Sequence, residues 1–162
     1  MPVDSENLIL AKWKTWATRP GGKRVFGYLL GRMIPYTGSI KPDVVSLKPG
    51  YAEVRLKDRK RVRNHLKSVH AVALMNLGEL ATGLAMNSAL SGNLRGIVTR
   101  LSMDYMKKAR GPLIAECQCD IPGRYTEAEY QVEGIIRDEV GDIVAVCSAT
   151  WLVGPKIPSR RR

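Results

Sequence analysis

The sequence is poor in residues that form disulfides or bind metals, with three cysteines and two histidines in 162 residues. An odd number of cysteines gives no complete disulfide framework, and two histidines leave a zinc site short of ligands. Cys117 and Cys119 stand two positions apart in an expected strand, where they share one face. We therefore predict no metal site and expect Cys117, Cys119 and Cys147 to be small, reduced residues of the core.

Long uninterrupted apolar runs are also absent from the sequence. The most apolar stretch, residues 69–94, contains His70, Asn76, Glu79 and several glycines, and these interruptions argue against a membrane-spanning helix. The chain does not open with the cationic region, apolar segment and small-residue cleavage site of a secretory signal. We therefore expect a cytoplasmic protein that does not span a membrane.

Acidic residues are few relative to basic ones: 15 Asp and Glu stand against 26 Lys and Arg, which gives a net charge of +11. Basic residues gather in residues 55–67, in the segment with Lys107, Lys108 and Arg110, and in residues 159–162. Such charge can bind a phosphorylated cofactor, bind nucleic acid or an acidic membrane surface, or simply be solvated. Nucleic-acid sites often interleave aromatic residues with cations, and residues 55–67 contain no Phe, Trp or Tyr. We therefore predict no nucleic-acid partner.

What is present is a chain of the length of one domain, which begins with a helical segment. Apolar residues at positions 7–17 recur at the spacing of an amphipathic helix, and the Thr-Arg-Pro-Gly-Gly sequence that follows ends it. A second short helix is predicted over residues 25–34, closed by Pro35. We assign residues 1–35 to an N-terminal helical extension, residues 36–155 to the main domain and residues 156–162 to a basic tail.

From residue 39 the apolar pattern changes to the period of two that is typical of strands. Residues 40–48 and 51–56 are joined by Lys-Pro-Gly and form a predicted hairpin. A long helix is predicted over residues 70–89, and four further strands follow it over residues 96–109, 113–120, 128–137 and 143–152. Two strands, one apolar helix and four antiparallel strands make an α+β pattern in which the helix lies on the sheet.

Within residues 69–94 the only formal charge is Glu79. A helix with so little charge is predicted to be buried, and a carboxylate there must find a partner or shift its pKa upward. A lone titratable group in such a place is a candidate for a functional site, while a structural ion pair with a sheet residue such as Arg100 is the alternative. Other residues of the same helix suggest a neighbouring apolar tunnel: Met75, Leu80, Met86 and Leu90.

His70 stands at the start of this helix, with Asn64 six residues before it and Glu79 nine residues after it. Nine residues at about 100° each place His70 and Glu79 on opposite sides of the helix, roughly 13 Å apart along its axis. Within one chain they cannot reach one small substrate atom, so they are either unrelated or part of a site between two copies of the chain. The structural alternatives are that His70 caps the helix and that Asn64 shapes a turn.

The order Asn, then His six residues later, then an acidic residue nine positions beyond resembles the signature of hotdog-fold acyl-CoA thioesterases of the phenylacetate-pathway type. Asn64, His70 and Glu79 match that spacing at all three positions. A closer similarity is to an uncharacterised bacterial branch of this superfamily, through the segments PYTGSI, RVRNHLKSVHAVAL and DYMKKARG. The resemblance implies a hotdog fold, in which an antiparallel sheet of about six strands wraps around one long central helix.

The resemblance also implies a reaction, the hydrolysis of an acyl thioester of coenzyme A or of an acyl-carrier protein. In that family a backbone N–H at the helix start polarises the thioester carbonyl, and an acidic residue of the neighbouring subunit acts as general base or nucleophile. Carried over, the N–H belongs to Ala71, the acid is Glu79, and Asn64 and His70 orient the groups. The chain is then expected to form a homodimer or a dimer of dimers. No cofactor is implied, since coenzyme A is part of the substrate.

A basic loop adds a second element to the predicted site. Lys107, Lys108 and Arg110 lie in a segment that resembles a loop near the coenzyme A phosphates in the family. The resemblance therefore implies that these three cations bind the phosphates, and the alternative is a solvated loop.

The sequence departs from the family pattern beside the predicted oxyanion site. The two glycines that follow the histidine in the family are Ala71 and Val72 here, and glycine is what allows the closest backbone approach. The strand position that carries a Ser or Thr in some members is Val98, with Thr99 next to it and facing the other way. These differences motivate a second hypothesis, an acyl-CoA or lipid-binding hotdog protein without turnover.

Overall fold

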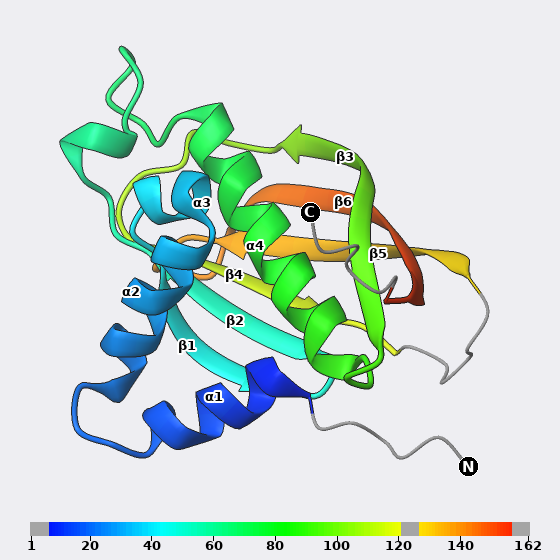
Figure 1. Ribbon diagram of the computed structural model, residues 1–162. Helices are drawn as coiled ribbons and strands as arrows, with labels where there is room; N and C mark the ends of the chain where they lie inside the picture. The colour runs from blue at the N-terminus through cyan, green and yellow to red at the C-terminus, as the bar shows by residue number, and fades with distance from the viewer. Residues whose placement is uncertain (1–6, 121–126, 157–162) are drawn as a thin grey trace.

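The computed structural model describes residues 7–120 and 127–156, so residues 157–162 of the predicted basic tail lie outside the described part. The described chain forms one antiparallel sheet of six strands with a long helix across it (Figure 1). The sheet order is β1-β2-β4-β5-β6-β3, so the strand that follows the long helix lies at an edge. Strands β1 to β6 are Asp43–Lys48, Tyr51–Leu56, Leu94–Tyr105, Leu113–Gln118, Ala128–Arg137 and Ile143–Pro155.

Helix α4, Ala71–Ala89, is the central element and packs on one face of the sheet (Figure 1). Its side chains Leu77 and Met86 are completely buried, and burying an apolar side chain of this size stabilises a fold by about 1.5–3 kcal/mol. Gly78 allows a close approach to β6, because a Cβ added there would come within 2.6 Å of the Cβ of Cys147. This sheet around one central helix confirms the predicted α+β hotdog fold.

The β1–β2 hairpin turns at the predicted Pro and Gly. Lys48 pairs with Tyr51 across the hairpin, so Pro49 and Gly50 are the two turn residues. Gly50 has a φ of +73°, a left-handed conformation that glycine adopts without steric cost. The predicted ranges of β2 and β5 are both confirmed residue for residue.

Three strand ends differ from the prediction by three or four residues. β1 begins at Asp43 rather than at residue 40, because helix α3 occupies the chain just before it. β3 ends at Tyr105 rather than at residue 109, because Ala109 turns toward the start of α4, where its carbonyl accepts a hydrogen bond from the Val69 N–H at 2.8 Å. β6 runs to Pro155 rather than to residue 152, since β3 continues to pair with it there.

Edge strand β3 contains a bulge. Its register on β6 shifts between Val98 and Arg100, which makes Thr99 the extra residue. Val98 and Leu101 pack against the core on either side of the bulge. Thr99 is exposed, and its hydroxyl lies 3.3 Å from the Thr150 carbonyl, to which it donates a hydrogen bond. The Thr99 hydroxyl therefore faces away from α4, as predicted.

Three helices precede the sheet: α1, Leu8–Ala17, α2, Gly22–Met33, and α3, Pro35–Ser39. α1 and α2 confirm the two predicted helices, although α2 begins three residues earlier than predicted. The second helix ends before Pro35, as predicted, and Pro35 then opens the short helix α3 at its first position. Proline is well suited there, since the first N–H of a helix has no intrahelical partner and the ring fixes a helical φ.

The N-terminal helices are held against the central helix by specific contacts. Asn7 caps α1 with its side-chain oxygen, and its amide nitrogen donates to the carbonyls of Asn87 and Leu90 at the end of α4, at 2.7 and 2.6 Å. The Trp13 and Phe26 rings meet edge to face at 5.1 Å, which joins α1 to α2. No helix within the described ranges is long and apolar enough to cross a membrane. The division of the chain at residue 35 stays a prediction.

Candidate functional site

The first turn of α4 has a free backbone N–H. His70 is the N-cap residue, and its Nδ1 accepts a hydrogen bond from the Val72 N–H at 3.1 Å. Ala71 is the first helical residue, so its N–H has no carbonyl within the helix to bond, and none of the described residues accepts from it. His70 and Ala71 are both exposed. The capping alternative for His70 is therefore confirmed, and the Ala71 N–H is open to a ligand.

Asn64 organises the loop before α4. Its side-chain oxygen accepts hydrogen bonds from the Leu66 N–H, the Ser68 N–H and the Ser68 hydroxyl, at 2.9, 3.2 and 3.1 Å. The loop then returns to the preceding chain through the His70 N–H, which donates to the Val62 carbonyl at 2.8 Å. The turn-shaping alternative for Asn64 is thus confirmed. An orienting role toward a substrate would fall to its amide nitrogen.

Tyr105 contacts the helix start from the end of β3. Its hydroxyl donates to the Ala71 carbonyl at 3.1 Å. Partial burial raises the pKa of Tyr105, with a smaller contribution from Cys147, so the hydroxyl keeps its proton and remains a donor. No motif marks this tyrosine, because the contact joins residues 34 positions apart.

The loop after β3 carries two predicted phosphate-binding cations to the start of α4. The hydrogen bond from the Val69 N–H to the Ala109 carbonyl anchors this loop directly before the helix. Lys108 and Arg110 flank the buried Ala109 and are exposed. Neither forms an ion pair with another residue of the described chain. Both cations are therefore free to bind an anionic group near the helix start.

Lys107 differs from its two neighbours because carboxylates already balance its charge. Its ammonium group forms ion pairs with Asp138 and Asp142 of the β5–β6 loop, at 2.8 and 2.7 Å. These two hydrogen bonds, with Asp138 contributing more, raise the pKa of Lys107. The sequence grouped Lys107 with the other cations because its acidic partners stand more than 30 positions away.

Glu79 lies halfway along α4 and is half-buried. Its carboxylate forms no ion pair or hydrogen bond with any described residue, so the alternative pairing with the exposed Arg100 is wrong. Burial raises the pKa of Glu79 above its ordinary value, because desolvation penalises the charged form. The nearby Cys147 thiol has a pKa raised to about 11. Its burial is the larger cause, and the negative charge of Glu79 is the smaller one.

The raised pKa of Glu79 predicts that replacing it with glutamine stabilises the fold at neutral pH. Above the folded-state pKa, the wild-type carboxylate is charged in both states and only folding desolvates it. Glutamine removes that penalty, which we expect to increase the free energy of unfolding by about 1 kcal/mol at pH 7.5. As pH falls through the folded-state pKa toward the ordinary value of about 4.3 for an unfolded chain, Glu79 becomes protonated. The difference in the free energy of unfolding between the two proteins then vanishes. Urea denaturation of both proteins at pH 7.5 and 4.5 measures this, and a less stable variant at pH 7.5 would contradict it.

A cavity of about 210 Å³ borders Glu79. One wall is α4, and of the predicted apolar tunnel residues Leu80 lines the cavity while Met86 and Leu90 are buried in the core. The opposite wall comes from the N-terminal helices, and Trp151 of β6 also lines the cavity. The sequence pattern of α4 could indicate an apolar wall but not which distant helices would complete it.

His70 lines a different cavity, of about 410 Å³, together with Tyr36, Arg61 and Asn76 among others. Glu79 does not border this cavity, and His70 does not border the one beside Glu79. The structure therefore brings the helix start and the basic loop together and keeps Glu79 apart from both within one chain.

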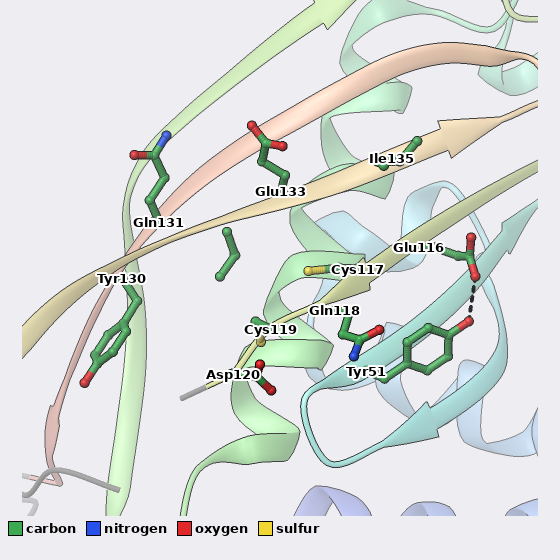
Figure 2. A pocket seen from close by; sticks show the side chains of 11 residues that line it. Tyr51, Glu116, Cys117, Gln118, Cys119, Asp120, Tyr130, Gln131, Glu133 and Ile135 are labelled. Carbon is green, nitrogen blue, oxygen red and sulfur yellow. Dashed lines mark hydrogen bonds between the residues drawn. The ribbon is translucent and has the colours of Figure 1, made fainter. Parts of the chain in front are cut away.

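A third cavity, of about 580 Å³, lies where β4 and β5 diverge beyond their last paired residues (Figure 2). None of the predicted site residues lines it. Tyr51 donates to the Glu116 carboxylate there at 2.7 Å, and this hydrogen bond raises the pKa of Tyr51. Cys117 and Cys119 on its wall are buried free thiols, as is Cys147, which confirms their prediction as core residues.

Comparisons with known proteins agree with the fold. A protein-family model described as "Domain of unknown function (DUF4442)" matches residues 22–153. The crystal structure of the genomics protein APC5556 is similar with a TM-score of 0.79 at 29% sequence identity, over 91% of this chain and 98% of its own. No curated protein matches this chain in sequence.

Two further similar structures have descriptions that mention thioesterases. The Pseudomonas aeruginosa protein PA5026, described as a protein of unknown function and probable thioesterase, has a TM-score of 0.73 at 24% identity. The similarity covers 85% of this chain and 97% of PA5026. The Haemophilus influenzae thioesterase HI1161 has a TM-score of 0.69 at 14% identity, over 82% of this chain and 92% of its own. At these identities the similarity shows a shared fold.

Proposed function

The chain belongs to the DUF4442 family and has a thioesterase-like hotdog structure, and from this premise we propose that it is a cytoplasmic acyl-CoA thioesterase-like hydrolase. The observation that carries the proposal is Glu79, a half-buried carboxylate with no ionic partner among the described residues, at the edge of an apolar cavity. Burial without a partner destabilises a fold, so such a group is typical of functional sites. The spacing of Asn64, His70 and Glu79 relates the proposal to thioesterases of the phenylacetate-pathway type.

Glu79 supplies the base in the proposed reaction. Its ionised carboxylate removes a proton from water, whose oxygen attacks the thioester carbonyl carbon, and the raised pKa strengthens this base. The carbonyl oxygen becomes an oxyanion, which the Ala71 N–H and the positive end of α4 stabilise. The C–S bond then breaks, the thiolate takes the proton from Glu79, and a carboxylic acid and free coenzyme A leave. In the alternative course the Glu79 carboxylate attacks the carbonyl carbon, and the C–S bond breaks to release the coenzyme A thiolate. Water then hydrolyses the resulting anhydride, which regenerates Glu79, releases the carboxylic acid and supplies the proton that the thiolate takes.

The proposed site lies between two copies of the chain. The Ala71 N–H and Glu79 are eight residues apart, roughly 12 Å along the axis of α4, and Glu79 shares no cavity with His70, so one thioester group meets both only if they come from different copies. Edge strand β3 supports such an assembly, because its 12 residues leave one row of backbone groups without a neighbouring strand in the described chain. Pairing of two β3 edges gives a twofold dimer with two equivalent sites, and two dimers could associate further.

Lys108 and Arg110 are proposed to bind the phosphates of coenzyme A. Replacing both with alanine is expected to raise KM for an acyl-CoA about tenfold, with little change in kcat, because phosphate contacts of this kind add binding energy far from the reacting atoms. The matched substrate is the same acyl group on pantetheine, which has no phosphates and whose KM should not change. An equal rise in KM for both thioesters would exclude a phosphate-binding role.

Release of free thiol tests the proposed function directly. Short, medium, long and aromatic acyl-CoAs are incubated with the wild-type protein and with Glu79→Gln, and the thiol is titrated over time. Release by wild type alone would support the hydrolase and identify the acyl class. Equal release by both proteins would exclude Glu79 as the base or nucleophile.

The second candidate function is an acyl-CoA or lipid-binding protein without turnover. Val72 supports it, since this branched side chain is 51% exposed at the start of α4, where thioesterases of the phenylacetate-pathway type have glycine. The bulge supports it too, because the Thr99 hydroxyl faces away from α4 and Val98 offers no hydroxyl in its place. This hypothesis predicts saturable acyl-CoA binding with no thiol released by wild type.

A further inference from the structure

Helix α2 presents two parallel rows of side chains to solvent. Within each row the residues are four positions apart, so their side chains lie above one another along the helix. All six residues are exposed, and together they define the outer face of α2: Arg24, Tyr28 and Arg32 in a basic row, and Val25, Leu29 and Met33 in an apolar row. A basic row directly beside an apolar row is the feature that the proposed function leaves unexplained.

Exposed apolar side chains are concentrated at this face. Of the 14 large apolar residues that are exposed in the described chain, six lie within residues 25–36. Met33 is 69% exposed and Tyr28 is 64% exposed. Single exposed apolar residues are ordinary, but a contiguous group of them marks an interaction site.

The charge of the N-terminal helices has one sign. Residues 7–42 contain seven Lys and Arg and no Asp or Glu, so this segment accounts for seven of the 11 net positive charges of the chain. A surface with so much charge of one sign attracts a partner of the opposite sign. The partner of the outer face of α2 is therefore anionic.

A cavity of about 570 Å³ lies beside the basic row. Arg24 and Arg32 line it from α2, and Lys41 lines it from the segment before β1. None of these three cations forms an ion pair with another residue of the described chain. The carboxylate of Asp43 also lines the cavity, but it pairs with Lys57 at 3.3 Å. The cavity is thus positively charged and suits a phosphate group.

The outer face of α2 lies far from the edge that the proposed dimer uses. Helix α2 packs against β1, and β1 and β3 are the two opposite edge strands of the sheet (Figure 1). None of the six residues of the face lines the cavity beside Glu79 or the cavity beside His70. Pairing of two β3 edges therefore leaves the outer face of α2 uncovered.

The two rows together match the surface of a phospholipid bilayer. Apolar side chains enter the acyl region, tyrosine rings lie at the level of the headgroups, and arginines bind the phosphates. A nucleic acid would contact the arginines but leave the apolar row exposed to water. A second copy of the chain, docked through the same face, would bring like charges together. Charge and apolarity therefore favour an anionic lipid surface.

We propose that the outer face of α2 docks the protein onto a bilayer that contains anionic phospholipids, with headgroup phosphates in the cavity beside Arg24 and Arg32. The helix lies along the bilayer surface, because its 12 residues are too few to cross the hydrocarbon region. This inference adds a binding surface to the proposed function and does not depend on hydrolysis.

Sedimentation with vesicles tests the docking. The full-length protein is mixed with vesicles of phosphatidylcholine alone or with an equal amount of phosphatidylglycerol. We expect binding to the anionic vesicles only. Binding should weaken as salt rises from about 0.1 to 1 M, where the Debye length falls from about 10 to 3 Å. Protein that stays in the supernatant with both kinds of vesicle would overturn the inference, and so would binding of duplex DNA in place of vesicles.

Charge reversal tests the basic row. Arg24→Glu/Arg32→Glu is expected to weaken binding at least about 20-fold, since each cation near an anionic surface strengthens binding about fivefold. Lys60→Glu/Lys67→Glu is the matched control, with the same change of net charge at exposed cations outside α2. It should bind within about twofold of wild type, because charges far from the bilayer are screened. Equal losses in both variants would show attraction by net charge alone and overturn the inference.

A second variant tests the apolar row without changing the charge. Leu29→Ser/Met33→Ser is expected to weaken vesicle binding about tenfold, because less apolar surface enters the acyl region. Both residues are exposed, so the fold should tolerate the change. Unchanged vesicle binding would overturn the docking geometry. Sedimentation without lipid provides the remaining test, since dissociation of a wild-type oligomer by these serines would identify the face as an interface between copies instead.

Discussion

Replacing Glu79 with glutamine is expected to lower kcat/KM for thioester hydrolysis by about 10²–10⁴-fold, the usual contribution of a positioned general base. Glutamine keeps the size of the side chain but can neither accept the proton of water nor attack the carbonyl. The fold should tolerate the change, because the carboxylate has no ionic or hydrogen-bond partner among the described residues. Thiol release gives the rates, and calorimetric titration with the same acyl-CoA shows that binding persists.

Two variants control this result. Glu133→Gln makes the same chemical change at an exposed glutamate on the wall of the cavity in Figure 2, and wild-type rates are expected there. A rate loss in Glu133→Gln but not in Glu79→Gln would move the active site to that cavity. Glu79→Asp retains the carboxylate but shortens its reach, so its activity should lie between those of glutamine and wild type.

The local features of the fold followed from the sequence where short-range chemistry decides them. The period of two and the Pro-Gly turn predicted the β1–β2 hairpin, because the left-handed conformation at Gly50 suits glycine. The near absence of charge predicted that α4 would be buried, and the one exception, Glu79, proved to have no ionic partner among the described residues. A residue that costs stability without a structural role is visible in a sequence because it breaks the surrounding pattern.

Features that depend on contacts between distant segments did not follow from the sequence. Lys107 resembles Lys108 in sequence, but only the folded chain brings the carboxylates of the β5–β6 loop to it. The donor of Tyr105 likewise has no local signature, since its acceptor belongs to another element. The sequence predicts a strand up to residue 109, whereas the long-range hydrogen bond from the Val69 N–H to the Ala109 carbonyl holds this residue in the loop after β3.

Proline at position 71 is expected to lower kcat by about 10²–10³-fold, the cost of losing one oxyanion donor. Ala71 is the first residue of α4, where proline is favoured because this N–H has no partner in the helix. The preceding residue, His70, already has φ of −66° and ψ of 141°, an extended conformation that a following proline requires. The substitution therefore removes the N–H and leaves the helix in place.

Ala71→Gly is the matched control for the proline variant. It keeps the N–H and restores the residue that the phenylacetate-type family carries there, so its activity should equal or exceed that of wild type. Circular dichroism and the urea midpoint establish that both variants fold. Full activity in a folded Ala71→Pro protein would show that the oxyanion is held elsewhere.

Mixing the two inactive variants tests quantitatively whether each active site combines residues of two copies of the chain. If each site combines Ala71 of one copy with Glu79 of the other, a dimer of Ala71→Pro with Glu79→Gln has one intact site and one site that lacks both groups. Random exchange in an equal mixture makes half of the dimers mixed, so about one quarter of all sites become intact and activity rises to about a quarter of wild type. If both residues served a site within one chain, no mixed dimer would contain an intact site. Activity would then stay at the level of the parent variants, and the proposed site between two copies would be excluded.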